Sequence, residues 1–270
     1  MWGRSKNLII KWLMKEPRRS SFPLCDFERI KYELRPCDVL LFEGKSRVSE
    51  MIKLITQSPW SHAALYIGRT HDIENPLLRE RVLQYYDGSL NSPLIIESML
   101  GKGTVVSSLD HYQKSHIRIC RPAGISREDA EKVREFAIGR LGMDYGIRQN
   151  LDIARLLLPW NIMPRRWRSS LFQHKPGTPT QEICSSMIAE AFGSVSFPIL
   201  PIVREDEQKG IKLFHRNTKL FTPRDFDYSP YFDIIKYPFI TINDHGIYRR
   251  LPWEDEMASE HDIDEQASQP

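Results

Sequence analysis

Five short apolar segments, separated by turn-forming residues, occupy the chain between residues 38 and 120. Val, Ile, Leu and Phe are frequent in them, and their lengths are typical of strands. The expected strands are 38–42, 62–67, 94–98, 104–107 and 116–120. The helical patterns that follow include one from Ser126 to about Leu141 and one from Ile183 to Phe192. A strand-rich region followed by helices is therefore predicted.

The segment that begins at residue 62 alternates between two faces, as a strand does. One face carries Ala63, Leu65 and Ile67. The other face carries His62, Ala64 and Tyr66. A histidine at the entry of a strand, with only a small residue beside it on its own face, has room to meet another side chain. A histidine satisfied within the core is the alternative.

Cys184 lies near the start of the second helical pattern. Thr180 is the expected N-cap of that helix, and Gly193 suits a left-handed residue just past its end. Backbone N–H groups and the positive end of the dipole stabilise a thiolate there, and they also suit an oxyanion. The competing interpretation is a buried structural cysteine.

Glu97 interrupts an otherwise apolar strand. A charge in such a position is costly unless it is paired, so Glu97 needs a partner. His62 on a neighbouring strand is the expected partner, with Glu97 accepting a hydrogen bond from Nδ1–H and orienting the ring. A glutamate that points to solvent from an edge strand is the alternative.

Composition excludes several classes of protein. The four cysteines of this 270-residue chain form no C-x-x-C pair, which argues against a disulfide framework and a zinc site. The stretch Gly44-Lys45-Ser46 imitates a phosphate-binding loop, but Val39 stands where a glycine is needed, so an NTPase is rejected. The net charge of +3 hides seven acidic residues and no basic ones in 254–270. We expect a disordered tail there and no nucleic-acid partner.

The N-terminal segment 1–19 mixes apolar and basic residues. Lys11 interrupts its apolar run, and no small-residue cleavage site follows, so we expect no cleavable signal peptide. No apolar run reaches the roughly 18 residues of a spanning helix. We predict a cytoplasmic protein or one peripheral to the membrane, with residues 1–19 as an amphipathic helix on anionic lipid. Docking of this segment on the domain is the alternative.

Five motifs, in order, resemble the circularly permuted papain-like hydrolases of the YaeF/YiiX type, a branch of the NlpC cell-wall hydrolase superfamily. They are Asp38-Val-Leu-Leu-Phe, Ser61-His62, Ile-Glu97-Ser, Gly142-Met-Asp-Tyr145 and Ile183-Cys184-Ser185. The resemblance covers about residues 35–195, and the histidine precedes the cysteine as it does in that branch. Cys37 departs from the pattern, since the group commonly has glycine before the aspartate of the first strand.

This resemblance implies an α+β fold, an antiparallel sheet with the nucleophile-bearing helix packed on it. It makes Cys184 the nucleophile, His62 the general base and Glu97 the orienting third member. Tyr145 and Trp60 are the expected substrate-binding residues, and neither a metal nor an organic cofactor is required. The expected organisation is an N-terminal basic amphipathic segment (1–29), one hydrolase domain (30–250) and an acidic tail (251–270).

The predicted function is a cysteine hydrolase that cleaves a peptide or N-acyl amide bond through a thioester. Its substrate would carry a peptide or acyl-amide group, with cell-wall peptides suggested by the superfamily. One alternative is a lipid-directed acyl hydrolase or acyltransferase at a membrane surface. Another is a non-catalytic binding module on the same scaffold, which would have no need of all three residues. The sequence does not predict the oligomeric state.

Overall fold

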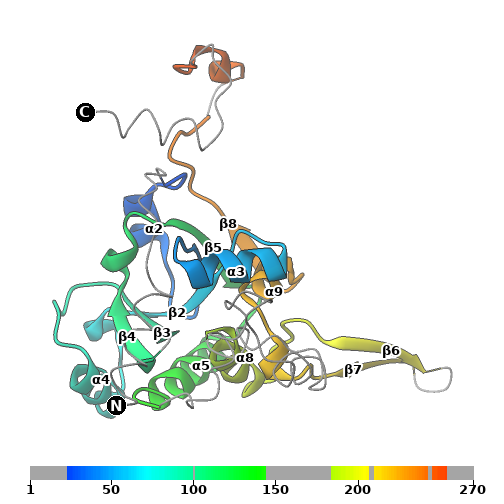
Figure 1. Ribbon diagram of the computed structural model, residues 1–270. Helices are drawn as coiled ribbons and strands as arrows, with labels where there is room; N and C mark the ends of the chain where they lie inside the picture. The colour runs from blue at the N-terminus through cyan, green and yellow to red at the C-terminus, as the bar shows by residue number, and fades with distance from the viewer. Residues whose placement is uncertain (1–22, 100, 144–183, 207–209, 243–244, 254–270) are drawn as a thin grey trace, which may run out of the picture.

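The computed structural model describes residues 23–99, 101–143, 184–206, 210–242 and 245–253 (Figure 1). Six strands of this part form one antiparallel sheet in the order β4-β3-β2-β1-β5-β8. In chain order they are β1 (Val39–Glu43), β2 (His62–Gly68), β3 (Leu94–Met99), β4 (Gly103–Ser108), β5 (His116–Pro122) and β8 (Phe232–Ile235). The five expected strands are confirmed to within two residues at each end, whereas β8 was not predicted.

Helices and one hairpin complete the described part. The α-helices are α2 (Phe27–Glu33), α3 (Arg47–Thr56), α4 (Pro76–Tyr85), α5 (Arg127–Gly139), α8 (Ser185–Gly193) and α9 (Pro223–Tyr228). The short 3-10 helices are η1 (Thr70–Asp72), η2 (Leu109–Tyr112), η3 (Thr218–Leu220) and η4 (Ile247–Arg250). Strands β6 (Ile202–Asp206) and β7 (Gly210–Phe214) pair with each other and extend away from the body (Figure 1).

The alternation along β2 divides the apolar interior into two cores. Ala63, Leu65 and Ile67 belong to the core that also contains the buried residues of α5 and α8. Ala64 and Tyr66 belong to the core beneath α2 and η2. The two faces predicted from the sequence are thus confirmed. Helix α8 packs against both α5 and β2, which brings its N-terminal end to the sheet that carries His62.

The helix that follows Cys184 differs from its predicted bounds at both ends. Cys184 is the N-cap of α8, so the helix begins directly after the thiol; Thr180 lies outside the described residues. Gly193 is the last helical residue and Ser194 the C-cap, both without a positive φ. The left-handed residue expected at Gly193 is instead Ser196, with φ 57°. Backbone N–H groups of the first turn consequently lie next to the thiol.

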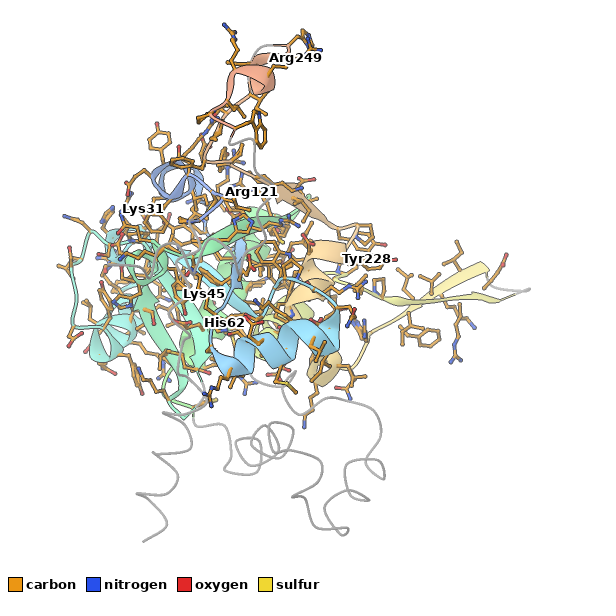
Figure 2. All side chains as sticks on the ribbon, turned by 45° about the horizontal axis from the view of Figure 1, so that its top comes forward. Lys31, Lys45, His62, Arg121, Tyr228 and Arg249 are labelled. Carbon is orange, nitrogen blue, oxygen red and sulfur yellow. The ribbon has the colours of Figure 1, made fainter. Side chains whose placement is uncertain are left out.

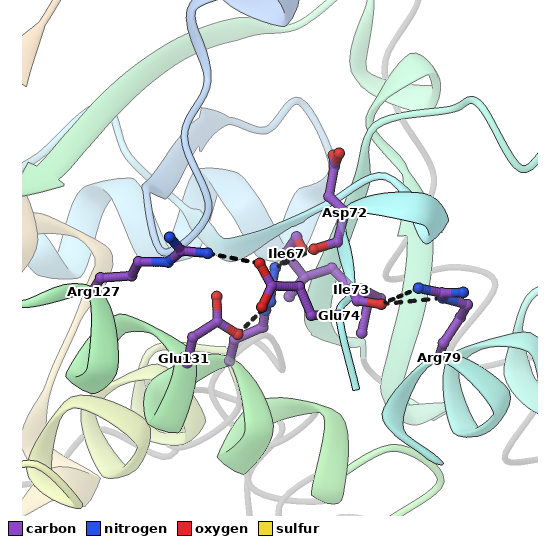
Figure 3. A network of polar contacts seen from close by, with 8 residues as sticks. Ile67, Asp72, Ile73, Glu74, Arg79, Arg127 and Glu131 are labelled. Carbon is purple, nitrogen blue, oxygen red and sulfur yellow. Dashed lines mark hydrogen bonds and ion pairs between the residues drawn. The ribbon is translucent and has the colours of Figure 1, made fainter. Parts of the chain in front are cut away.

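Two arginines, Arg134 (buried) and Arg121 (partly buried), hold the elements around β2 together. Arg134 on α5 donates to the carbonyl oxygens of Ile67 (3.4 Å) and Asp72 (3.2 Å) and pairs with Glu131. This contact ties α5 to the end of β2 and to η1. These three partners of Arg134 are labelled in Figure 3. On the other side, Arg121 of β5 makes a bidentate pair with Asp38, at 2.8 and 2.7 Å. Asp38 is 1% exposed, so this pair is one of the buried contacts that hold β1 in place.

The ends of the expected hydrolase domain fall partly outside the described residues. Helix α2, capped by Asp26, crosses the expected boundary at residue 30, so the folded body includes at least Phe27 onwards. Residues 1–22 and 254–270 lie outside the described part, and so do the predictions made for the amphipathic segment and for most of the acidic tail. Among the described residues, no helix has both the length and the apolar character needed to cross a bilayer.

Candidate active site

His62 is the first residue of β2, on the face of the sheet that α2 and η2 cover (labelled in Figure 2). Its side chain keeps 21% of its surface exposed. The ring lies 5.9 Å from that of Phe42 on β1 and is stacked at 6.2 Å on that of Tyr112. Position at a strand entry therefore gives His62 a packed ring with one accessible edge.

Glu97 lies on the next strand, β3, and is 1% exposed. The register places Glu97 opposite Ala64, on the same face of the sheet as His62. Its Oε2 lies 2.6 Å from Nε2 of His62. The structure thus brings together the two residues paired in the sequence analysis, but through the other ring nitrogen, since the expected donor was Nδ1–H. The rotamer of His62, which the sequence does not encode locally, decides this.

Tyr112 contacts both Glu97 and His62, and the sequence analysis did not predict it as a site residue. Its hydroxyl donates to Oε2 of Glu97 at 2.5 Å, the same oxygen that faces His62. The Ser107 hydroxyl is a third hydrogen-bond partner of this carboxylate. Burial raises the pKa of Glu97, but the hydrogen bonds and the charge of His62 outweigh it, so the pKa lies below its ordinary value. Glu97 is therefore ionised despite its burial.

Cys184 approaches His62 from the other side, at the start of α8. Cys184 is 7% exposed, and the His62 ring lies near enough for the two groups to shift each other's pKa. Because Glu97 occupies Nε2, Nδ1 is the nitrogen left for the thiol. A backbone hydrogen bond from Ala63 and the Ser185 hydroxyl, 3.8 Å from Sγ, complete the surroundings of the sulfur. His62 thus stands between a carboxylate and a thiol.

The charges of Cys184, His62 and Glu97 stabilise one another. Burial lowers the pKa of His62, but the Cys184 thiolate and then Glu97 raise it more, to about 10. Burial likewise raises the pKa of Cys184, yet His62 and the hydrogen bonds to the sulfur hold it below the ordinary value of 9.0. The two directions together favour a thiolate beside an imidazolium over the neutral pair.

The structure does not place the two predicted substrate-binding residues among Cys184, His62 and Glu97. Tyr145 lies outside the described residues. Trp60 is 1% exposed, and its Nε1–H donates to Oδ2 of Asp227 at 3.3 Å. Arg118 covers its ring at 4.6 Å, and the ring of His116 stacks on it at 5.4 Å. Trp60 therefore packs in the interior, in the core that α5 and α8 cover, and a substrate contact at this residue stays a prediction.

The described residues contain no group of three or more His, Cys, Asp or Glu side chains arranged to hold a metal ion. What they do contain is a row of sulfur, imidazole and carboxylate at the start of a helix. Chemically, such a row combines an activated nucleophile, an acid–base group and a group that orients it. Backbone N–H groups at the start of α8 add a place for negative oxygen.

One comparison with known families matches part of the chain. Residues 33–155 match the family described as permuted papain-like amidase enzyme, YaeF/YiiX, C92 family. The matched segment includes His62, Glu97 and Tyr112 and ends before Cys184. The match confirms the resemblance seen in the sequence, and with it the α+β fold and the class of cysteine hydrolases of the amidase or peptidase type.

A search of curated proteins found no match to the chain. Among solved structures, the crystal structure of metalloprotein YiiX from Escherichia coli O157:H7 is similar, with 13% sequence identity and a TM-score of 0.44. The alignment covers 75% of this chain and 97% of that one. A likeness at this score carries no further argument about the site.

Proposed function

We propose that this cysteine hydrolase of the permuted papain-like type cleaves an amide bond, of a peptide or an N-acyl group, through a Cys184-His62-Glu97 triad. The observation that carries the proposal is the position of His62, 2.6 Å from the Glu97 carboxylate through Nε2 and near enough to Cys184 for the two groups to shift each other's pKa. A cysteine with only a structural role does not require a histidine beside its thiol or a buried, ionised glutamate behind that histidine. The raised pKa values of the other buried cysteines, Cys37 and Cys120, are what such a thiol ordinarily shows.

The first half of the reaction follows from the charge state. The Cys184 thiolate attacks the carbonyl carbon, and the carbonyl π electrons move to oxygen. Backbone N–H groups at the start of α8 would hold this oxyanion. The His62 imidazolium gives its proton to the amide nitrogen as the C–N bond breaks. An amine leaves, and an acyl group remains on sulfur as a thioester.

The second half returns the enzyme to its starting state. His62, now neutral, takes a proton from a water molecule while the water oxygen attacks the thioester carbonyl. The C–S bond then breaks, a carboxylic acid leaves, and the thiolate–imidazolium pair is restored. Glu97 accepts from Nε2 throughout and keeps Nδ1 directed at the reacting atoms. Cell-wall peptides are the substrate class we propose to try first, because the superfamily is directed at them.

Trapping of the acyl-enzyme tests this proposal. The full chain is mixed with p-nitrophenyl acetate, a generic acyl donor, and then with a panel of peptide and N-acyl amides. We expect an acetyl group on Cys184 by intact-mass and peptide mass spectrometry, a burst of p-nitrophenolate, and decay of the adduct with time. Cys120→Ala, which removes a buried thiol elsewhere, should behave like the wild type.

The outcomes separate the proposal from its alternatives. No adduct, or equal labelling of Cys184 and the other cysteines, would overturn the catalytic role and favour a binding module. An adduct that persists without hydrolysis would refute a hydrolase. Turnover of fatty-acyl substrates but of no peptide amide would move the assignment to a lipid-directed acyl hydrolase.

A further inference from the structure

Tyr112 is held in place by the element that carries it. It ends the 3-10 helix η2, whose first residue, Leu109, is fully buried and donates its N–H to the carbonyl of Pro93 at 2.9 Å. Asp110 of the same element pairs with Lys31 on α2 at 2.8 Å. The Tyr112 ring also packs 4.1 Å from Phe42 on β1. Its hydroxyl is thus aimed by packing that does not depend on the triad.

The hydroxyl of Tyr112 and the ring of His62 share one acceptor atom. Both contact Oε2 of Glu97, at 2.5 Å and 2.6 Å. An oxygen that already accepts one short hydrogen bond is a weaker base toward a second donor. The titratable groups that face Tyr112 are Glu97 from β3 and Cys184 from the start of α8, and His62 from β2 is stacked on its ring.

We propose that Tyr112 is a positioning residue that lowers the basicity of Glu97. The proton on Nε2 of His62 then stays on the imidazole, and the proton on Nδ1 can be released to a leaving group. The inference rests on the function proposed above. Without the hydroxyl, the carboxylate left behind when His62 deprotonates loses one of its donors. The free energy of the Glu97–His62 pair then rises most in the state in which His62 is deprotonated. The pKa of His62 rises as a result.

The sign of this effect distinguishes it from a merely structural role. Loss of the Tyr112 hydroxyl should raise the pKa of His62, because Glu97 becomes the stronger base. Loosened packing would do the opposite, since a weaker Glu97–His62 contact lowers the pKa of the histidine. The structure therefore predicts a shift that ordinary destabilisation does not produce.

The test is an NMR titration of the His62 imidazole in the full chain. Cys184→Ala is the background, because it removes the coupled thiolate and leaves Glu97 as the charge next to His62. Adding Tyr112→Phe should raise the pKa of His62 by about one pH unit. Tyr66→Phe is the matched control: Tyr66 belongs to the same core, but the charges that act on its hydroxyl are those of Arg69, Asp72 and Asp38. It should leave His62 unchanged.

A second variant guards against a folding defect in the first. Replacing Tyr112 by a ring-fluorinated tyrosine keeps the ring and strengthens the donor, so it should lower the pKa of His62. An unchanged or lowered pKa in Tyr112→Phe, or an unchanged or raised one in the fluorinated chain, would overturn the inference. These outcomes are separate from a failure of the proposed function, which acyl-enzyme trapping measures on the wild-type chain.

Discussion

Removal of the Glu97 charge should lower the pKa of His62 without unfolding the protein. In Glu97→Gln the amide keeps the shape of the side chain and can still accept from Tyr112, but it no longer attracts the imidazolium. Two unit charges about 4 Å apart attract by about 4 kcal/mol at an effective dielectric constant of about 20. Since about 1.4 kcal/mol corresponds to one pKa unit, this is an upper bound of about three units.

Desolvation reduces that bound. Glu97 is 1% exposed, and part of the attraction only compensates for keeping its charge away from water. We therefore expect the pKa of His62 to fall by between about one and three units when Glu97→Gln is added to Cys184→Ala. NMR titration of the imidazole measures it directly. If His62 titrates identically with and without the carboxylate in a folded protein, the 2.6 Å contact has no electrostatic role and the reasoning is wrong.

Three further predictions follow from the described contacts and from the sequence. Activity of the wild type should rise through the pKa of Cys184, which lies below 9.0, and fall again as His62 loses its proton near pH 10; a profile of kcat/KM against pH measures both limbs. Arg121→Met, which leaves Asp38 buried without its partner, should lower the free energy of unfolding by about 3–5 kcal/mol and leave the pKa of His62 unchanged, as urea denaturation and NMR would show. The segment 1–19 should carry the chain to anionic vesicles, so a chain lacking it should fail to co-sediment with them; equal binding by both chains would remove the membrane proposal.

Much of the site could be predicted because simple rules govern its residues. Alternation along β2 assigned His62 to one face, and the cost of a buried charge led from Glu97 to His62. Cys184 followed from the advantage of a helix start for a thiolate. In each case one local pattern and one physical cost were enough.

What the sequence did not reveal depends on three-dimensional placement. Tyr112 belongs to a short 3-10 helix without periodicity, and only the packing of η2 brings its hydroxyl to Glu97. The choice between Nδ1 and Nε2 is a matter of rotamer. The burial of Trp60 depends on Asp227 and Arg118, both far away in the chain. No spacing rule connects these partners.

One residue carries a conformational cost that the sequence hinted at. Cys37 has a φ of 78°, in the left-handed region that favours glycine. The permuted papain-like hydrolases that the sequence resembles commonly have glycine at this position. The side chain is nonetheless fully buried in the core beneath α5 and α8. Burial of the sulfur offsets part of the backbone strain, which explains how a departure from the family pattern leaves β1 and the site intact.

Selective reactivity of Cys184 is the most direct test of the account. The native chain carries three other cysteines, Cys25, Cys37 and Cys120, all buried and all with a raised pKa, so they serve as internal controls. Brief treatment with iodoacetamide across a pH series, followed by peptide mass spectrometry, measures the alkylation of each. The account predicts that Cys184 alone is labelled at neutral pH and that His62→Ala moves its labelling to higher pH. A wild-type Cys184 that stays unlabelled until pH 9 or reacts no faster than the other three would contradict it.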